Sequence, residues 1–93
     1  MNKCFTWEPI RSLQLLEERG ISFEDVVFYI QKGNLLDCLR YRNPQRDPQQ
    51  GVLVVEIDHY TYLVPFVETH EAYCLQTITP CRIAKKVYSG SLS

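Results

Sequence analysis

The sequence predicts an α+β domain: two N-terminal helices packed on a four-stranded, mainly antiparallel sheet, followed by a short C-terminal helix. Two observations support this. Apolar residues recur with a helical period over residues 8–33, and from residue 34 they alternate or run together as they do in strands. Consecutive strands joined by short links favour an antiparallel meander with the helices on one face. The 93 residues fit a single domain, 1–93.

The first helix is expected over residues 8–19. Pro9 suits its first turn, where the missing N–H costs nothing, and Gly20 suits the position after its end, where positive φ is common. Leu15 lies near the edge of its expected apolar face. That face is formed by Ile10, Leu13 and Leu16.

The second helix is expected to begin at Ser22, because Asp25 three residues later completes a short capping box. Gly33 ends it. Its apolar stripe has helical spacing and comprises Phe23, Val26, Val27 and Ile30.

Four strands are expected, over 35–42, 52–58, 60–67 and 72–79, and the final helix over 81–88. Asp58 and His59 form the turn between the second and third strands. Pro65 indicates an edge position or a bulge in the third strand, since proline cannot donate to the ladder. Alternation in the first strand places on one side Leu35, Asp37, Leu39 and Tyr41.

Charge is distributed unevenly along the chain. The formal net charge is −1, yet residues 72–93 contain three Lys or Arg and no acid, whereas residues 1–71 contain seven basic and eleven acidic residues. Local rather than net charge decides whether a surface can meet a phosphate backbone. The C-terminal segment is therefore the first candidate for a cationic site.

Two basic clusters follow from the predicted elements. On the C-terminal helix Arg82, Lys85 and Lys86 share one face, and Arg40, Arg42 and Arg46 occupy the end of the first strand and its loop, with Arg40 and Arg42 on one side. If both clusters face one groove, tyrosines could stack on single-stranded RNA there: Tyr41, Tyr60, Tyr62 and Tyr73. The alternative is a solvated helix end whose lysines favour the helix dipole.

Few other residues suggest chemistry. His59 and His70 each lie in a predicted turn. Each is interpreted either as an exposed polar residue or as a general acid or base in a site. Glu56 interrupts an apolar run, so its carboxylate either faces solvent or projects into a site. The four cysteines lack C-x-x-C spacing and no secretory signal precedes them, so we expect reduced, mostly buried cysteines in a cytoplasmic protein with no metal and no cofactor. No apolar run approaches the roughly 20 residues of a membrane span.

Three segments resemble a known family. FTWEP at 5–9 precedes the first helix, ERGISFEDV at 18–26 links the two helices, and RIAKKVY at 82–88 follows the strands. In this order they are similar to the BrnT-type toxins of the RelE-like superfamily of bacterial toxin–antitoxin systems. The resemblance extends over nearly the whole chain.

The resemblance implies a RelE-like fold and a metal-independent ribonuclease that cleaves RNA, inhibits translation and binds a cognate antitoxin. A 2′-hydroxyl would attack the adjacent phosphate while cations stabilise the transition state. It assigns catalysis to Arg82, Lys85 and Tyr88, to which His59 is added as the acid or base. RNA binding is expected of Arg40, Arg42, Arg46 and Lys86. Because residues 52–67 contain no Lys or Arg, the C-terminal segment must supply most of the positive charge.

Two alternatives stay open. A non-catalytic interaction module would bind another protein through the helices and the edge containing Pro65. A relative of the toxins could also bind RNA without cleaving it. The expected partners are the antitoxin and RNA, with the ribosome and a homodimer as open alternatives, and no membrane.

Overall fold

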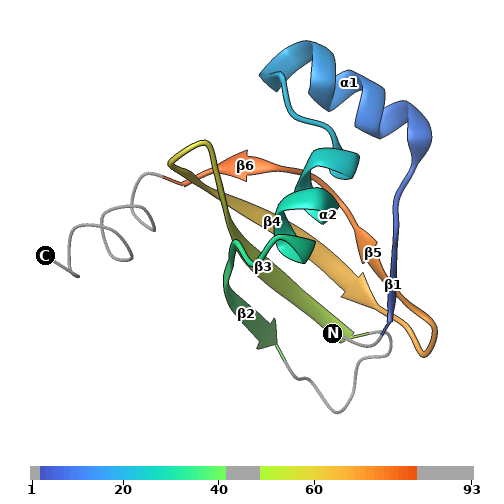
Figure 1. The fold of residues 1–93 in the computed structure, drawn as a ribbon. Coiled ribbons are helices and arrows are strands. Elements are labelled where there is room, and N and C mark those ends of the chain that lie inside the picture. Colours follow the sequence, from blue (N-terminus) through green and yellow to red (C-terminus); the bar gives the residue numbers. More distant parts are fainter. Residues whose placement is uncertain (1–2, 42–48, 82–93) are drawn as a thin grey trace, which may run out of the picture.

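The computed structural model describes residues 3–41 and 49–81, and places two helices and six strands there (Figure 1). The α+β class and the mainly antiparallel sheet are confirmed. The elements are β1 Cys4–Thr6, α1 Pro9–Arg19, α2 Phe23–Gln31, β2 Leu35–Tyr41, β3 Gln49–Ile57, β4 Tyr60–Glu68, β5 Ala72–Leu75 and β6 Thr79–Pro80.

The sheet is wider than the predicted four strands. Its order is β1-β5-β4-β3-β2, and β6 also pairs with β4. All pairs are antiparallel except β1 with β5, which is parallel. The predicted fourth strand is divided into β5 and β6, and β1 precedes the helices. The predicted C-terminal helix falls, apart from Cys81, outside the described residues.

Pro65 lies in the interior of β4 and not on an edge strand, so that part of its prediction was wrong. It registers with Val52 of β3, and its carbonyl accepts a hydrogen bond from the Gln76 amide at 2.8 Å. The N and O of one strand residue point to the same side, so its missing N–H faces the irregular stretch between β5 and β6. Residues 76–78, between β5 and β6, form no regular strand pairing with β4, so the missing N–H of Pro65 does not break a ladder there.

Both helix starts and the first helix end follow the prediction. Gly20 has φ 74°, and its amide donates to the Leu16 carbonyl at 2.9 Å. At α2 the capping box is formed, with the Ser22 amide donating to Asp25 Oδ2 at 2.9 Å and the Asp25 amide donating to Ser22 Oγ at 3.3 Å.

The predicted apolar face of α1 was wrong. Ile10, Leu13 and Leu16 are 70%, 61% and 45% exposed. The buried residues are Leu15 and Ser12, whose hydroxyl donates to Glu24 Oε2 at 2.9 Å and accepts from the Phe23 amide at 3.1 Å. The short link at Gly20 turns α1 so that this polar contact, rather than the aliphatic stripe, meets α2.

The core lies between α2 and one side of the sheet, here called the helix face (Figure 1). In α2 the predicted stripe is confirmed, because Phe23 and Val26 are buried and Val27 and Ile30 pack against them. Ile78, in the link between β5 and β6, also belongs to the core. Members from the sheet include Leu53, Val55, Ile57, Val64, Phe66, Tyr73 and Leu75.

A bulge in β2 changes which side chains share a face. Leu35 registers with Val55 and Asp37 with Val54, so the intervening Leu36 has no partner in the register. Leu35 therefore shares the helix face with Val55, whereas Asp37 lies on the opposite face. The prediction that Leu35 and Asp37 lie on one side was wrong because alternation assumes an unbroken strand.

Candidate functional site

The hairpin between β3 and β4 forms one end of the sheet. Asp58 and His59 have positive φ values of 52° and 69°, and Ile57 registers with Tyr60. Two consecutive left-handed residues make the type I′ turn that suits the twist of a two-residue hairpin. The predicted turn is confirmed, and it leaves His59 and Tyr60 exposed.

Helix α2 contacts this turn through Tyr29. The Tyr29 hydroxyl donates to Asp58 Oδ1 at 3.2 Å, and Lys32 Nζ lies 5.5 Å from the centre of the Tyr29 ring. Loss of solvent, and then the bond to the Asp58 carboxylate, raise the pKa of Tyr29. The turn is thus held by a tyrosine with a lysine beside it.

The chain reaches the same end of the sheet from β6. Pro80 registers with Tyr62, and the Cys81 amide donates to the Thr61 carbonyl at 2.9 Å. Thr61 is buried, and its hydroxyl has no hydrogen-bond partner within the described part of the chain. Residue 81, immediately before Arg82, therefore lies beside the first residues of β4. We call Asp58, His59, Tyr60 and Cys81 the hairpin end.

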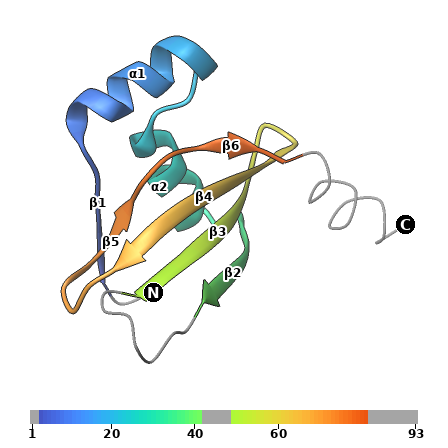
Figure 2. The ribbon, with the colours of Figure 1, turned by 180° about the vertical axis from the view of Figure 1, so that it is seen from behind.

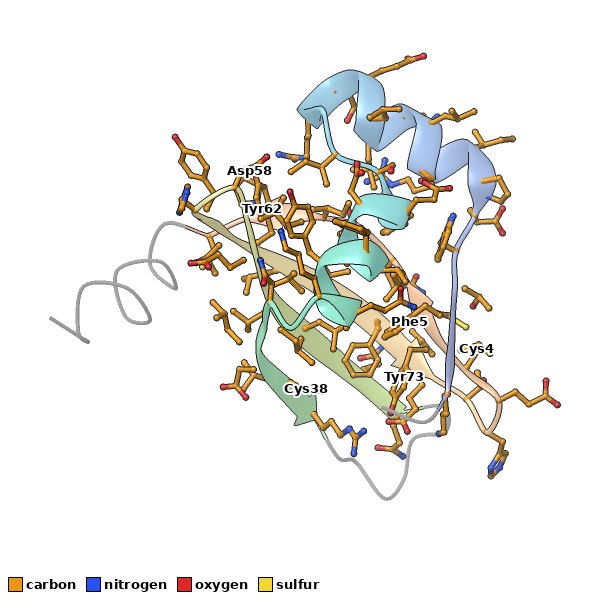
Figure 3. All side chains as sticks on the ribbon, in the orientation of Figure 1. Cys4, Phe5, Cys38, Asp58, Tyr62 and Tyr73 are labelled. Atoms are coloured by element: carbon orange, nitrogen blue, oxygen red, sulfur yellow. The ribbon has the colours of Figure 1, made fainter. Side chains whose placement is uncertain are left out.

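Most of the predicted site residues lie outside the described ranges: Arg42, Arg46, Arg82, Lys85, Lys86 and Tyr88. The structure places the other two, His59 and Arg40, at opposite ends of the sheet. Figure 3 shows the separation, with Asp58 and Tyr62 at one end and Tyr73 at the other.

Arg40 belongs to a packed cluster. Its Nη2 donates to the Tyr73 hydroxyl at 2.9 Å, and its Nε lies 3.6 Å from Glu68 Oε1. Lys3 Nζ contacts the other oxygen of Glu68 at 2.6 Å and donates to the Thr69 carbonyl at 2.7 Å. The Glu68 carboxylate raises the pKa of Arg40. We call Lys3, Arg40, Glu68 and Tyr73 the Arg40 end.

Tyr73 is part of the core and is not a stacking platform for a base. It is buried, its ring lies 5.3 Å from that of Phe66 at 87°, and Phe5 lies 5.6 Å away (Figure 3). Gly51 makes room for Phe66, because a Cβ there would meet that ring and would lie 2.5 Å from the Leu39 carbonyl oxygen. The predicted role of Tyr73 in stacking was wrong.

The described residues do not support a common groove for the two basic clusters. Thr61, beside Cys81, and Glu68, beside Arg40, are seven residues apart on β4. At about 3.3 Å per residue this is about 23 Å. The chain enters the basic C-terminal segment at the end opposite Arg40.

Other candidates are placed as follows. His70 is exposed in the β4–β5 link at the Arg40 end, far from His59. Glu56 is half-buried and registers with Thr61 on the face opposite the helices. None of the four cysteines is in a disulfide bond and none is buried, so the prediction of mostly buried cysteines was wrong.

Residues 3–41 and 49–81 contain no group of three His, Cys, Asp or Glu suited to a metal ion. In the same ranges, neither helix has the length and apolar character to cross a membrane.

Sequence reasoning missed two arrangements. Lys3 and Glu68 are 65 residues apart, and their contact follows from the parallel pairing of β1 with β5, for which a three-residue strand gives almost no signal. The bond between Tyr29 and Asp58 depends on the position of α2 over the sheet. Comparisons of the chain with protein-family models, curated proteins and solved structures gave no match.

Proposed function

We propose that this chain is the toxin of a bacterial type II toxin–antitoxin pair, acting in the cytoplasm as a metal-independent ribonuclease that inhibits translation. One observation supports it beyond the sequence motifs. At the hairpin end the exposed His59 lies in the turn that precedes β4. In the same part of β4 the Thr61 carbonyl accepts a hydrogen bond from the amide of Cys81, the residue before Arg82. An exposed imidazole and the residue that precedes the basic segment thus lie at the same end of the sheet.

In the proposed reaction the 2′-oxygen of a ribose attacks the adjacent phosphorus, and the bond from phosphorus to the 5′-oxygen of the next nucleotide breaks. His59 accepts the proton of the 2′-hydroxyl, as an imidazole can near neutral pH. Arg82 and Lys85 stabilise the charge on the phosphoryl oxygens, and Tyr88 completes the site. The leaving 5′-oxygen takes a proton from water, so the products are a 2′,3′-cyclic phosphate and a 5′-hydroxyl.

The geometry divides the proposed RNA-binding residues. Arg40 contacts Glu68, at the end of β4 opposite the hairpin, and shares that carboxylate with Lys3, so we assign it to the stability of the fold and not to the reacting phosphate. Contacts with RNA are proposed for Lys86, close to Arg82 in the chain, and for Arg42 and Arg46.

Expression of the chain alone, followed by RNA analysis, tests this function. We expect growth arrest, relieved by co-expression of the product of a neighbouring gene. We also expect the purified chain, with ribosomes added in a parallel reaction, to generate 2′,3′-cyclic phosphate ends in the presence of EDTA. Normal growth together with intact RNA in both reactions would exclude the ribonuclease. Bound but intact RNA would favour an RNA-binding relative of the toxins.

A second candidate is a non-catalytic protein-interaction module, favoured by the exposed stripe on α1. Ile10, Leu13 and Leu16 lie at spacings of three on one helix and are all exposed. Such a module would not arrest growth. Substitution of Ile10 by Asp would weaken partner binding without changing the stability of the fold.

A further inference from the structure

The face of the sheet opposite the helices has an unusual composition. Strand register places its side chains in rows, because alternate residues of each strand share a face. One row contains Leu39, Val52 and Pro65; the next contains Asp37, Val54 and Leu63. We call this the bare face, formed by Asp37, Leu39, Val52, Val54, Glu56, Thr61, Leu63, Pro65, Val67 and Cys74.

No described element lies over the bare face. Figure 2 shows β3 and β4 from this side, with α2 behind the sheet and α1 beyond its edge. The consequence is visible within single strands. On the helix face Leu53 and Val64 are fully buried, whereas their neighbours Val52 and Leu63 on the bare face are only half-buried. Val54, at the centre, is only 1% exposed, so the side chains around it supply the accessible surface of this face. Half-buried aliphatic residues on central strands indicate a surface that another element can cover.

The dimensions of the patch fit one helix. Adjacent strands are about 4.8 Å apart and same-face residues about 6.7 Å apart, so each side chain occupies about 32 Å² of sheet. The five accessible apolar residues, Leu39, Val52, Leu63, Pro65 and Val67, together occupy a footprint of about 160 Å² on the sheet. A helix about 10 Å across covers two strand spacings and contacts all of these residues within about three turns.

Charge determines the kind of helix. Asp37 and Glu56 are the charged residues in these rows, and the described strands place no Lys or Arg among them. A second copy packed face to face would bring acid against acid, and RNA would meet the same repulsion. A helix with basic residues flanking its apolar stripe would place an opposite charge beside Glu56.

We infer that the bare face docks the apolar side of an amphipathic, basic-flanked helix from a partner protein. This deepens the proposed function by giving the antitoxin a docking surface, and it rests on that function only for the identity of the partner. The helix would lie on the side of the sheet away from α1 and α2, with Glu56 directing it toward the hairpin end.

A pair of synthetic peptides tests the inference. Each has 18 residues, one built from Leu and Lys and one from Leu and Glu with the same apolar stripe. We expect the Leu/Lys peptide to bind about tenfold more tightly by calorimetry, and the amide shifts it causes in NMR spectra to concentrate at Leu39, Val52 and Leu63. Equal affinities, or shifts centred on α1 or the Arg40 end, would overturn it.

The chain offers a matched pair of control variants. Leu39 and Leu36 lie on the same strand and are 40% and 38% exposed, but Leu39 belongs to the bare face and Leu36 is the bulge residue. Lysine is well tolerated on edge strands. Leu39→Lys should weaken Leu/Lys binding about tenfold and Leu36→Lys less than about twofold. Equal losses would mean that the peptide senses general charge and not this face.

Glu56→Lys is a second, independent variant. It should lower affinity for the Leu/Lys peptide and raise affinity for the Leu/Glu peptide, whereas an unchanged preference would contradict the charge argument.

Sedimentation of the unmodified chain tests whether a second copy of the chain covers the bare face instead. Self-association that Leu39→Lys abolishes would show that it does. Growth arrest by the chain alone is measured separately, so failure of docking and failure of the toxin function can be distinguished.

Discussion

The two ends of β4 contain similar residue types and arrange them differently. At the Arg40 end Lys3 and Arg40 share one carboxylate, Glu68, around a buried tyrosine. At the hairpin end His59 and Tyr60 are exposed beside the residue that precedes the basic segment. A basic side chain near a tyrosine is therefore part of a structural contact at the Arg40 end, whereas at the hairpin end both side chains are accessible.

The difference shows why local sequence charge overstates the charge available to a ligand. Arg40 counts as a cation in the sequence, but in the fold it joins β2 to Glu68 of β4 and to Tyr73 of β5. An RNA phosphate would have to compete with Glu68 for it. The proposed function therefore assigns the contact with the reacting phosphate to Arg82 and not to Arg40.

The largest expected effect is the difference between Arg82→Ala and Arg40→Ala. If Arg82 contacts developing charge, its removal should lower the initial rate of RNA cleavage about 100- to 1000-fold, by analogy with the loss of an oxyanion-hole donor. Arg40→Ala should change the rate less than about threefold, because Arg40 lies at the other end of β4. Rates are measured with purified, folded variants. Equal losses from both substitutions would disprove the separation of roles, and a fully active Arg82→Ala would remove the C-terminal segment from catalysis.

His59→Gly separates catalysis from turn geometry. His59 adopts φ 69°, a conformation that glycine reaches without strain, and Asp-Gly is a favoured type I′ pair. The substitution should therefore stabilise the fold by about 0.5–1 kcal/mol in urea unfolding. Loss of a general base should lower cleavage about 100-fold. A more stable variant with undiminished cleavage would show that His59 serves only the turn.

At the Arg40 end, Glu68→Gln tests whether the shared carboxylate stabilises the fold. Both ion pairs weaken together, but Lys3 and Arg40 are partly exposed and screened by solvent, so we expect a loss of about 1 kcal/mol in urea unfolding. Glu71→Gln is the matched control on the adjacent link, where the residue is exposed, and should change stability by less than about 0.5 kcal/mol. No loss from Glu68→Gln would leave Arg40 available to bind RNA.

Features determined by neighbouring residues could be predicted from the sequence. The Ser22–Asp25 capping box, the left-handed Gly20 and the Asp58-His59 turn each depend on a few adjacent residues, and each is confirmed. Features determined by long-range packing could not. The parallel pairing of Cys4 with Ala72 joins residues 68 positions apart through a three-residue strand.

The candidate site shows the same limit. Alternation cannot reveal a bulge, so the face of Asp37 became clear only from its register with Val54. Helical period identified Ile10, Leu13 and Leu16 as a stripe, but the direction in which α1 faces is set by the Ser12 hydroxyl and its bonds to α2. The burial of Tyr73 required the ring of Phe66 from β4.

The smallest expected effect concerns the contact between α2 and the hairpin turn. Loss of solvent contributes most to the raised pKa of Tyr29, and the bond to Asp58 adds to it, so Asp58→Asn should lower this pKa only part of the way toward its ordinary value. Asparagine tolerates the left-handed conformation of residue 58, so the turn is retained.

A raised folded-state pKa means that the neutral phenol is favoured in the native protein. The stabilisation it provides is present at neutral pH and is lost as the pH rises through the folded-state value. NMR titration of the tyrosine ring carbons in the parent and in Asp58→Asn measures the shift. If the Tyr29 titration does not change, α2 does not hold the turn through this bond, and the hairpin end is positioned by the sheet alone.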